Sequence, residues 1–179
     1  MLTLRTLLPA ASLALSVATA AEASDRGYLG DGQPWIVGAG AIVLRASDRT
    51  QVAGSVRVGH RLGDLGDVRL GLDVGKGVLA PFGEVLLMPV ELGRLTLGVS
   101  VAAGLRREDG VNAFFVRAAP MLAFRPFSIA SRPVCYGCPV PNDHSPLQLE
   151  LGLPEVEGRF ASGNSALAVG ASLRVAVRF

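Results

Sequence analysis

Three neighbouring residues, Asp143, His144 and Ser145, are of the types that a hydrolase uses as acid, base and nucleophile. Adjacent residues of an extended segment point in opposite directions, so His144 and Ser145 can form a proton relay only if the chain turns between them. The alternative is that these residues belong to an ordinary loop, and the sequence favours that interpretation. We therefore predict no catalytic residue in this chain.

The chain contains two cysteines, Cys135 and Cys138. Their spacing fits a redox pair or half of a metal site. No histidine follows directly, as it would in a haem attachment motif, and no second cysteine pair completes a zinc site. A structural disulfide is the better interpretation, and such a bond persists in an oxidising compartment. We predict neither a metal site nor a cofactor.

The first residues have the layout of a secretory signal peptide. Residues 1–23 contain an early positive charge at Arg5, an apolar stretch over residues 7–17, and an Ala-x-Ala cleavage site that ends at Ala23. A second such site ends three residues earlier. A membrane anchor is the alternative, but its apolar core needs about 20 residues. We predict that residues 1–23 are removed and that residues 24–179 form one exported domain.

Period-two alternation of apolar and other residues dominates the rest of the chain and predicts β-strands. We expect eight strands, at residues 33–45, 52–61, 68–75, 82–91, 94–106, 112–127, 147–153 and 165–179. Pro120 cannot donate a hydrogen bond to a neighbouring strand, so we expect a bulge or break there. Two connections are expected to be long, at residues 128–145 and 157–165, and the first is rich in proline and holds both cysteines.

The two faces of these strands distinguish a membrane barrel from a soluble one. One face is aliphatic, and the other carries Gly, Ala and Ser with occasional charges, as in the alternate rows of residues 94–106. A small soluble barrel instead fills its interior with bulky apolar side chains and turns polar ones outward. Strands that span lipid must close into a barrel, because open edges would leave backbone groups unpaired. We predict an all-β protein, a closed antiparallel up-and-down transmembrane barrel of about eight strands.

The charged residues on the small-residue face are expected to lie in the barrel interior. A buried charge is costly unless it is paired, so we predict that these residues form a structural charge network near the axis and the mouths of the barrel. The predicted network comprises Arg57, Arg69, Asp73, Glu84, Arg117, Arg125, Glu150, Arg174 and Arg178. Arginines outnumber carboxylates in this set.

With its period-two alternation and its predicted signal peptide, the chain resembles the small eight-stranded outer-membrane barrels of Gram-negative bacteria, the OmpA and OmpX type. The pattern Leu173-x-Val175-x-Val177-x-Phe179 is similar to the C-terminal signal that the assembly machinery of that membrane recognises. The resemblance implies location in the cell outer membrane, with the surrounding lipid and the assembly machinery as partners. It also implies a monomer. Aromatic residues make up 6 % of the chain, so we expect thin aromatic girdles.

The functional prediction is a small outer-membrane barrel with a structural or surface-interaction role and no catalysis. The formal net charge of +2 gives no reason to expect nucleic acid as a partner. One alternative is an outer-membrane enzyme that modifies lipid A or phospholipid, and another is a soluble periplasmic barrel that binds an apolar ligand. If the aliphatic face meets lipid, Leu97→Arg should impair insertion, whereas Gly98→Ser on the opposite face should be milder.

Overall fold

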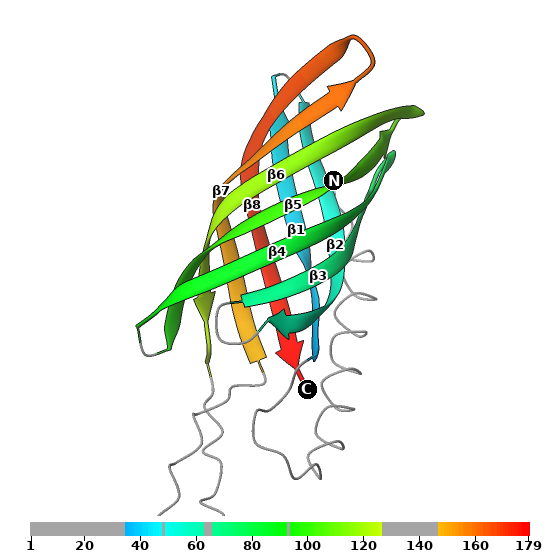
Figure 1. Cartoon of the computed structure of the whole chain (residues 1–179). Coiled ribbons are helices and arrows are strands. Elements are labelled where there is room, and N and C mark those ends of the chain that lie inside the picture. Colours follow the sequence, from blue (N-terminus) through cyan, green and yellow to red (C-terminus); the bar gives the residue numbers. More distant parts are fainter. Residues whose placement is uncertain (1–34, 48, 63–65, 93, 127–146) are drawn as a thin grey trace, which may run out of the picture.

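The computed structural model describes residues 35–47, 49–62, 66–92, 94–126 and 147–179. Eight antiparallel strands form one closed barrel, in which each strand pairs with the next and β8 returns to pair with β1 (Figure 1). The strands are β1 (Trp35–Ala46), β2 (Arg49–Leu62), β3 (Gly66–Gly75), β4 (Val78–Leu92), β5 (Leu95–Glu108), β6 (Val111–Phe124), β7 (Leu147–Ala161) and β8 (Asn164–Arg178). The prediction of a closed, eight-stranded antiparallel barrel is confirmed.

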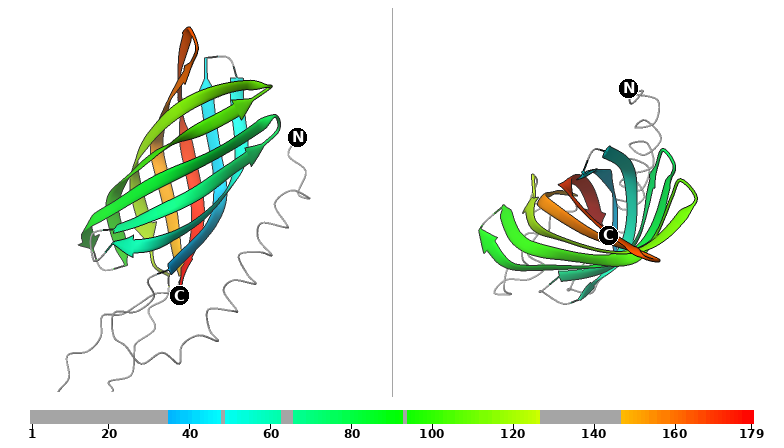
Figure 2. Two further views of the ribbon diagram at one scale, coloured as in Figure 1. Left: turned by 45° about the vertical axis from the view of Figure 1, so that its right-hand side comes forward. Right: turned by 90° about the horizontal axis from the view of Figure 1, so that it is seen from above.

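The barrel has two ends of different character. At the end called here the hairpin end, short turns join β1 to β2, β3 to β4, β5 to β6 and β7 to β8. The opposite end, called the terminal end, holds Trp35 and Phe179, which exchange two backbone hydrogen bonds of 3.2 and 3.0 Å. The strands are strongly tilted, and the hairpin of β7 and β8 rises farthest (Figure 2). The β1–β8 seam is therefore closed down to the last residue.

The turns at the hairpin end have the chemistry that tight hairpins require. Asp109 and Gly110 both adopt positive φ, at 48° and 86°, as a two-residue Asp-Gly turn between antiparallel strands demands. The connection expected at residues 157–165 is shorter than predicted. Strand β7 continues to Ala161, and β8 begins at Asn164. The expectation of a long loop is wrong, because the polar residues of this segment occupy inward and rim positions on two long strands.

Two strands contain an extra residue, and both insertions lie at prolines. On β4 the pairing with β5 shifts between Leu87 and Val90, across Pro89. On β7 the pairing with β8 shifts between Gly152 and Glu155, and the pairing with β6 shifts between Gly152 and Val156, in both cases across Pro154. Strand β6 stays in register with β5 through Pro120, so the irregularity expected there lies on the neighbouring strand β7. An extra residue reverses which alternate positions face inward.

The outer surface of the barrel is aliphatic. Leu70, Leu105 and Leu173 are 67 %, 64 % and 59 % exposed and lie on three different strands. The interior holds small apolar clusters, such as Leu86 with Met88 and Met121, beside buried charges. In the ranges described, no helix is long and apolar enough to cross a membrane. The predicted signal peptide at residues 1–23 and the loop at 128–145 lie outside the described residues.

Candidate functional site

The interior of the barrel is filled largely by charged side chains. Arg69, Arg174, Glu84, Glu150 and Glu157 are at most 2 % exposed. They project inward because they occupy the positions that alternate with the exposed aliphatic rows. Removing an ionised group from water costs several kcal/mol, so the fold is stable only if each charge has close partners. The partners form three groups along the axis and a further cluster at one mouth of the barrel.

The first group lies toward the terminal end and centres on Arg69. Its Nη1 and Nη2 each lie 2.7 Å from an oxygen of Glu150, and Nη2 is also 2.8 Å from Oδ2 of Asp67. Arg178 approaches the same Asp67 oxygen at 3.5 Å, and the Gln148 amide donates to Glu150 at 2.9 Å. Strands β3, β7 and β8 are joined through these contacts across the interior.

The second group lies near the middle of the barrel and centres on Glu84 of β4. Its two carboxylate oxygens accept hydrogen bonds from Arg174 at 2.7 Å and from Arg57 at 3.0 Å. The Ser100 hydroxyl donates to Glu84 at 2.5 Å. The guanidinium of Arg57 also lies over the Phe82 ring, 5.0 Å from its centroid, which is a cation–π arrangement. Four strands therefore meet at one carboxylate.

The third group centres on Arg117 of β6 and continues toward the hairpin end. Arg117 Nη2 lies 2.6 Å from Asp73 and 2.8 Å from Glu157, and Nε lies 3.5 Å from Glu155. Its guanidinium is 4.9 Å from the centroid of the Phe115 ring. The hydroxyl group of Ser55 hydrogen-bonds Asp73 from β2.

The network ends in a cluster at the hairpin-end mouth. Arg159 donates to Glu157 at 2.6 Å, to Glu108 at 3.1 Å and to the side-chain oxygen of Gln51 at 2.7 Å. Arg106 contacts Glu108 at 3.1 Å and Glu157 at 3.4 Å, and it donates to Gln51 as well. A hollow of about 290 Å³ lies at this mouth, and Arg106, Glu108 and Arg159 of the cluster contribute to its lining. The charged cluster is therefore continuous with a hollow at the hairpin end.

Within the described residues, the interior ion pairs join seven arginines to seven carboxylates. The arginines are Arg57, Arg69, Arg106, Arg117, Arg159, Arg174 and Arg178, and the carboxylates are Asp67, Asp73, Glu84, Glu108, Glu150, Glu155 and Glu157. The paired charges are thus balanced. Three of these carboxylates, Asp73, Glu84 and Glu150, belong to the network predicted from the sequence.

The structure places eight of the nine residues of the predicted network in these contacts. The ninth, Arg125, lies half-buried just beyond β6 at the terminal end, and its backbone N–H donates to Arg94. The predicted assembly signal lies along the β1–β8 seam. Its outward row is exposed at Leu173 but buried at Val177, which is 6 % exposed.

Sequence reasoning missed Glu155, Glu157 and Arg159 because it ended the strand at residue 153. Pro154 is the signal that could have found them, since an extra residue at a proline shifts the inward positions from even to odd numbers. Arg106 could have been found directly, because it continues the inward row of Ser100.

Most of the residues considered for catalysis and metal binding belong to a segment outside the described ranges. Asp143, His144, Ser145 and both cysteines lie outside the described residues. His60 is exposed on the outer face, where its ring meets Trp35 edge-on at 5.1 Å. No group of three or more metal-ligating residues occurs in the part of the chain that the structure describes.

A scan against protein-family models and a search of curated proteins both find no match.

Proposed function

We propose that this protein is a small outer-membrane barrel whose outer rows contact lipid and whose interior is closed by ion pairs, with a structural or surface-interaction role and no catalysis. In the proposed orientation, the terminal end of the barrel faces the periplasm and the hairpin end faces the cell exterior.

The observation that carries the proposal is the inverted distribution of polar and apolar side chains. The arginines and carboxylates of the interior are buried, while leucines and valines on all sides of the barrel are exposed. Soluble monomers rarely expose contiguous apolar patches larger than a few hundred Å². Lipid hydrocarbon is the solvent in which such a surface is stable.

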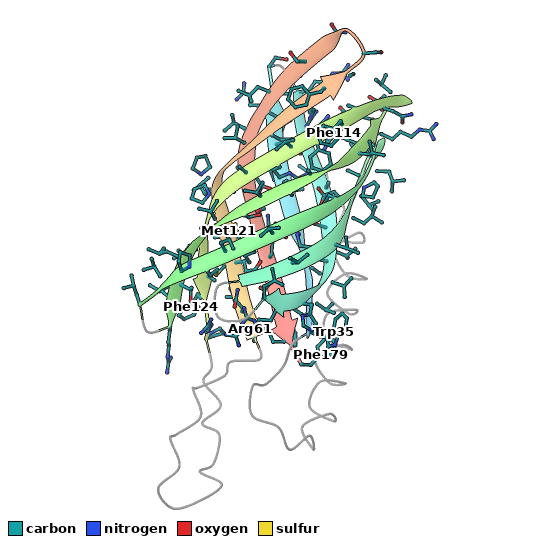
Figure 3. The ribbon with its side chains drawn as sticks, in the orientation of Figure 1. Trp35, Arg61, Phe114, Met121, Phe124 and Phe179 are labelled. Atoms are coloured by element: carbon teal, nitrogen blue, oxygen red, sulfur yellow. The ribbon has the colours of Figure 1, made fainter. Side chains whose placement is uncertain are left out.

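Aromatic side chains support the same placement at both ends of the apolar surface. Phe114 and Phe124 point outward at the two ends of β6 (Figure 3). Ten positions along a strand, at about 3.4 Å each and a tilt of about 40°, span about 26 Å along the membrane normal. An outer-membrane barrel has an apolar band about 25 Å tall between aromatic girdles. Phe160 joins Phe114 at the hairpin end, and Trp35 lies at the terminal end.

The interior supports a structural role in place of transport or catalysis. Arg69, Glu84, Arg117 and Glu157 each contact two or more oppositely charged groups inside the barrel. A group engaged in this way is held in place and is not free to bind substrate. The surface-exposed hairpin end is then the part of the molecule that is available to partners.

The experiment uses Trp35, the single tryptophan of the chain. The protein is refolded into phosphatidylcholine vesicles whose acyl chains carry bromine either near the headgroup or near the chain end. Shallow bromines should quench Trp35 more strongly than deep ones. In the double variant Trp35→Phe/Val101→Trp the order should reverse, because Val101 lies in the middle of the outward row of β5.

A barrel that spans the bilayer should also migrate faster on an unboiled gel than after boiling, and it should sediment with the outer membrane when expressed in a Gram-negative host. If neither tryptophan is quenched and the protein stays monomeric in buffer without detergent, the proposal is wrong. The alternative of a soluble barrel is then the better interpretation. Hydrolysis or acyl transfer on added lipid, lost in His144→Ala, would contradict the absence of catalysis.

A further inference from the structure

Four exposed cations lie at the hairpin end, and three of them, all except Arg49, lie directly beyond the apolar outer rows. Arg45 follows Val43 in the outward row of β1, and Arg107 follows Leu105 in the outward row of β5. Lys76 lies in the turn between β3 and β4. We call Arg45, Lys76 and Arg107 the basic rim.

Arg107 lies where the apolar surface ends. It pairs across the ladder with Leu79, which is 48 % exposed, and it follows Leu105, which is 64 % exposed. An arginine in such a position can lay its aliphatic stem along the apolar surface and extend its guanidinium beyond it. In a membrane this is the depth at which hydrocarbon gives way to lipid headgroups.

Two carboxylates follow Arg107 along the chain, and both are already engaged. Glu108 contacts Arg106 and Arg159 at the mouth of the barrel, and Asp109 lies at the junction of the hairpins. Its Oδ2 lies 3.7 Å from Nη1 of Arg49, and its backbone N–H donates to Gly77 at 3.0 Å. These contacts connect the β1–β2, β3–β4 and β5–β6 hairpins. They also pair the negative charge of Asp109 with Arg49. Lys76, next to Gly77, and Arg107, two residues before Asp109, are then two cations held at one junction of hairpins.

We infer that the basic rim binds the phosphate groups of anionic lipids in the leaflet at the hairpin end. This inference rests on the proposed membrane-spanning role, which puts the rim at headgroup level. Phosphate oxygens accept charge-assisted hydrogen bonds from guanidinium and ammonium groups. Each basic residue close to an anionic membrane surface strengthens association about fivefold. The apolar rows fix the depth of the barrel, and the rim selects which lipids surround it.

The test measures lipid selectivity in vesicles by electron spin resonance. Spin-labelled phosphatidylglycerol and phosphatidylcholine are compared for the fraction that is immobilised at the barrel surface. The wild-type protein should prefer phosphatidylglycerol, and the preference should weaken as salt is added. In Lys76→Gln/Arg107→Gln the preference should fall by about fivefold or more, and adding Arg45→Gln should lower it further.

Matched variants separate a loss of charge from a loss of folding. Lys76→Arg/Arg107→Lys should keep the wild-type preference, and Asp109→Asn should raise it because it removes the negative charge from the junction. Arg94→Gln removes an exposed cation at the opposite end, in the β4–β5 turn, and should have the smaller effect. Insertion of each variant is checked by its migration on an unboiled gel.

The inference is overturned if an inserted Lys76→Gln/Arg107→Gln protein keeps the wild-type preference, if wild-type selectivity is insensitive to salt, or if Arg94→Gln lowers the preference as much as the double variant. Each of those results leaves the membrane-spanning proposal intact. Failure of the wild-type protein to insert into any vesicle overturns the membrane-spanning proposal itself.

Discussion

Arg69 and Glu150 form a two-point ion pair in the barrel interior, with each terminal guanidinium nitrogen 2.7 Å from a carboxylate oxygen. The two residues are 81 positions apart in the chain and belong to β3 and β7, which lie opposite each other in the ring of eight strands. Both side chains are at most 1 % exposed. This contact stabilises the fold by joining two distant strands, and no local pattern in the sequence shows that these strands face each other.

Removal of one partner from this pair should destabilise the barrel. We expect Arg69→Met to lower the free energy of unfolding by about 3 to 5 kcal/mol, because Glu150 is left charged and buried. The double variant Arg69→Met/Glu150→Met should lose less than the sum of the two single changes. Urea unfolding in phospholipid vesicles measures all three, with the exposed Arg94→Met as the control. Strictly additive losses would contradict the claim that Arg69 and Glu150 stabilise each other.

The cost of a charge on the outer surface should depend on depth. Val101 lies in the middle of the outward row of β5, and Val101→Arg should cost about 2 to 4 kcal/mol, whereas Leu105→Arg near the hairpin end should cost about 0 to 1 kcal/mol. Val101→Ala controls for the lost side chain. The readout is the fraction of protein that inserts into vesicles, together with its unfolding midpoint. Similar losses at both depths would argue against a bilayer around these rows.

Glycines on the two faces should respond differently to a side chain. A Cβ on Gly98 would meet the carbonyl oxygen of Leu87 at 2.0 Å, whereas a Cβ on Gly83 would meet nothing within 4 Å. We therefore expect Gly98→Ala to cost about 1 to 3 kcal/mol by overpacking and Gly83→Ala to be tolerated. The sequence predicts only that Gly98→Ser is milder than Leu97→Arg, and this geometry adds a packing cost at Gly98. Thermal unfolding of both variants in one detergent makes the comparison, and equal midpoints would refute it.

The depth of a carboxylate within the network should set its importance. Glu157 contacts Arg106, Arg117 and Arg159 and is fully buried, while the Glu108 side chain is 23 % exposed. Glu157→Gln should therefore destabilise the barrel more than Glu108→Gln, because water can compensate for charge lost at the mouth. Denaturant titrations at matched salt give the ranking. A larger loss from Glu108→Gln would place the main support of the network at the mouth.

The barrel and its two faces could be predicted because both depend on local alternation. Each strand shows a period of two, and the aliphatic rows are continuous enough to identify which face is outward. The position of Arg57 or Arg174 in the interior follows from that parity alone. The strand count follows from the number of such segments between turns.

Pairing across the interior could not be predicted, because it depends on register and on bulges. The extra residue at Pro154 decides that Glu155 and Glu157 face inward, and the strand predicted from the sequence ends before that proline. The choice of Glu150 as the partner of Arg69 depends on how eight strands stagger when the sheet closes. Alternation identifies which charged residues can face the interior, but the closed sheet determines which of them form ion pairs.

The contacts that cross the interior also bear on the mechanics of the molecule. A thin-walled tube that is squeezed from the side flattens into an ellipse unless something resists along its diameter. Arg69 with Glu150 connects opposite walls, and Arg117 with Asp73 connects β6 to β3 at another height. These ties act as internal struts, so the cross-section should stay round under sideways pressure, which in the proposed membrane location would come from lipid.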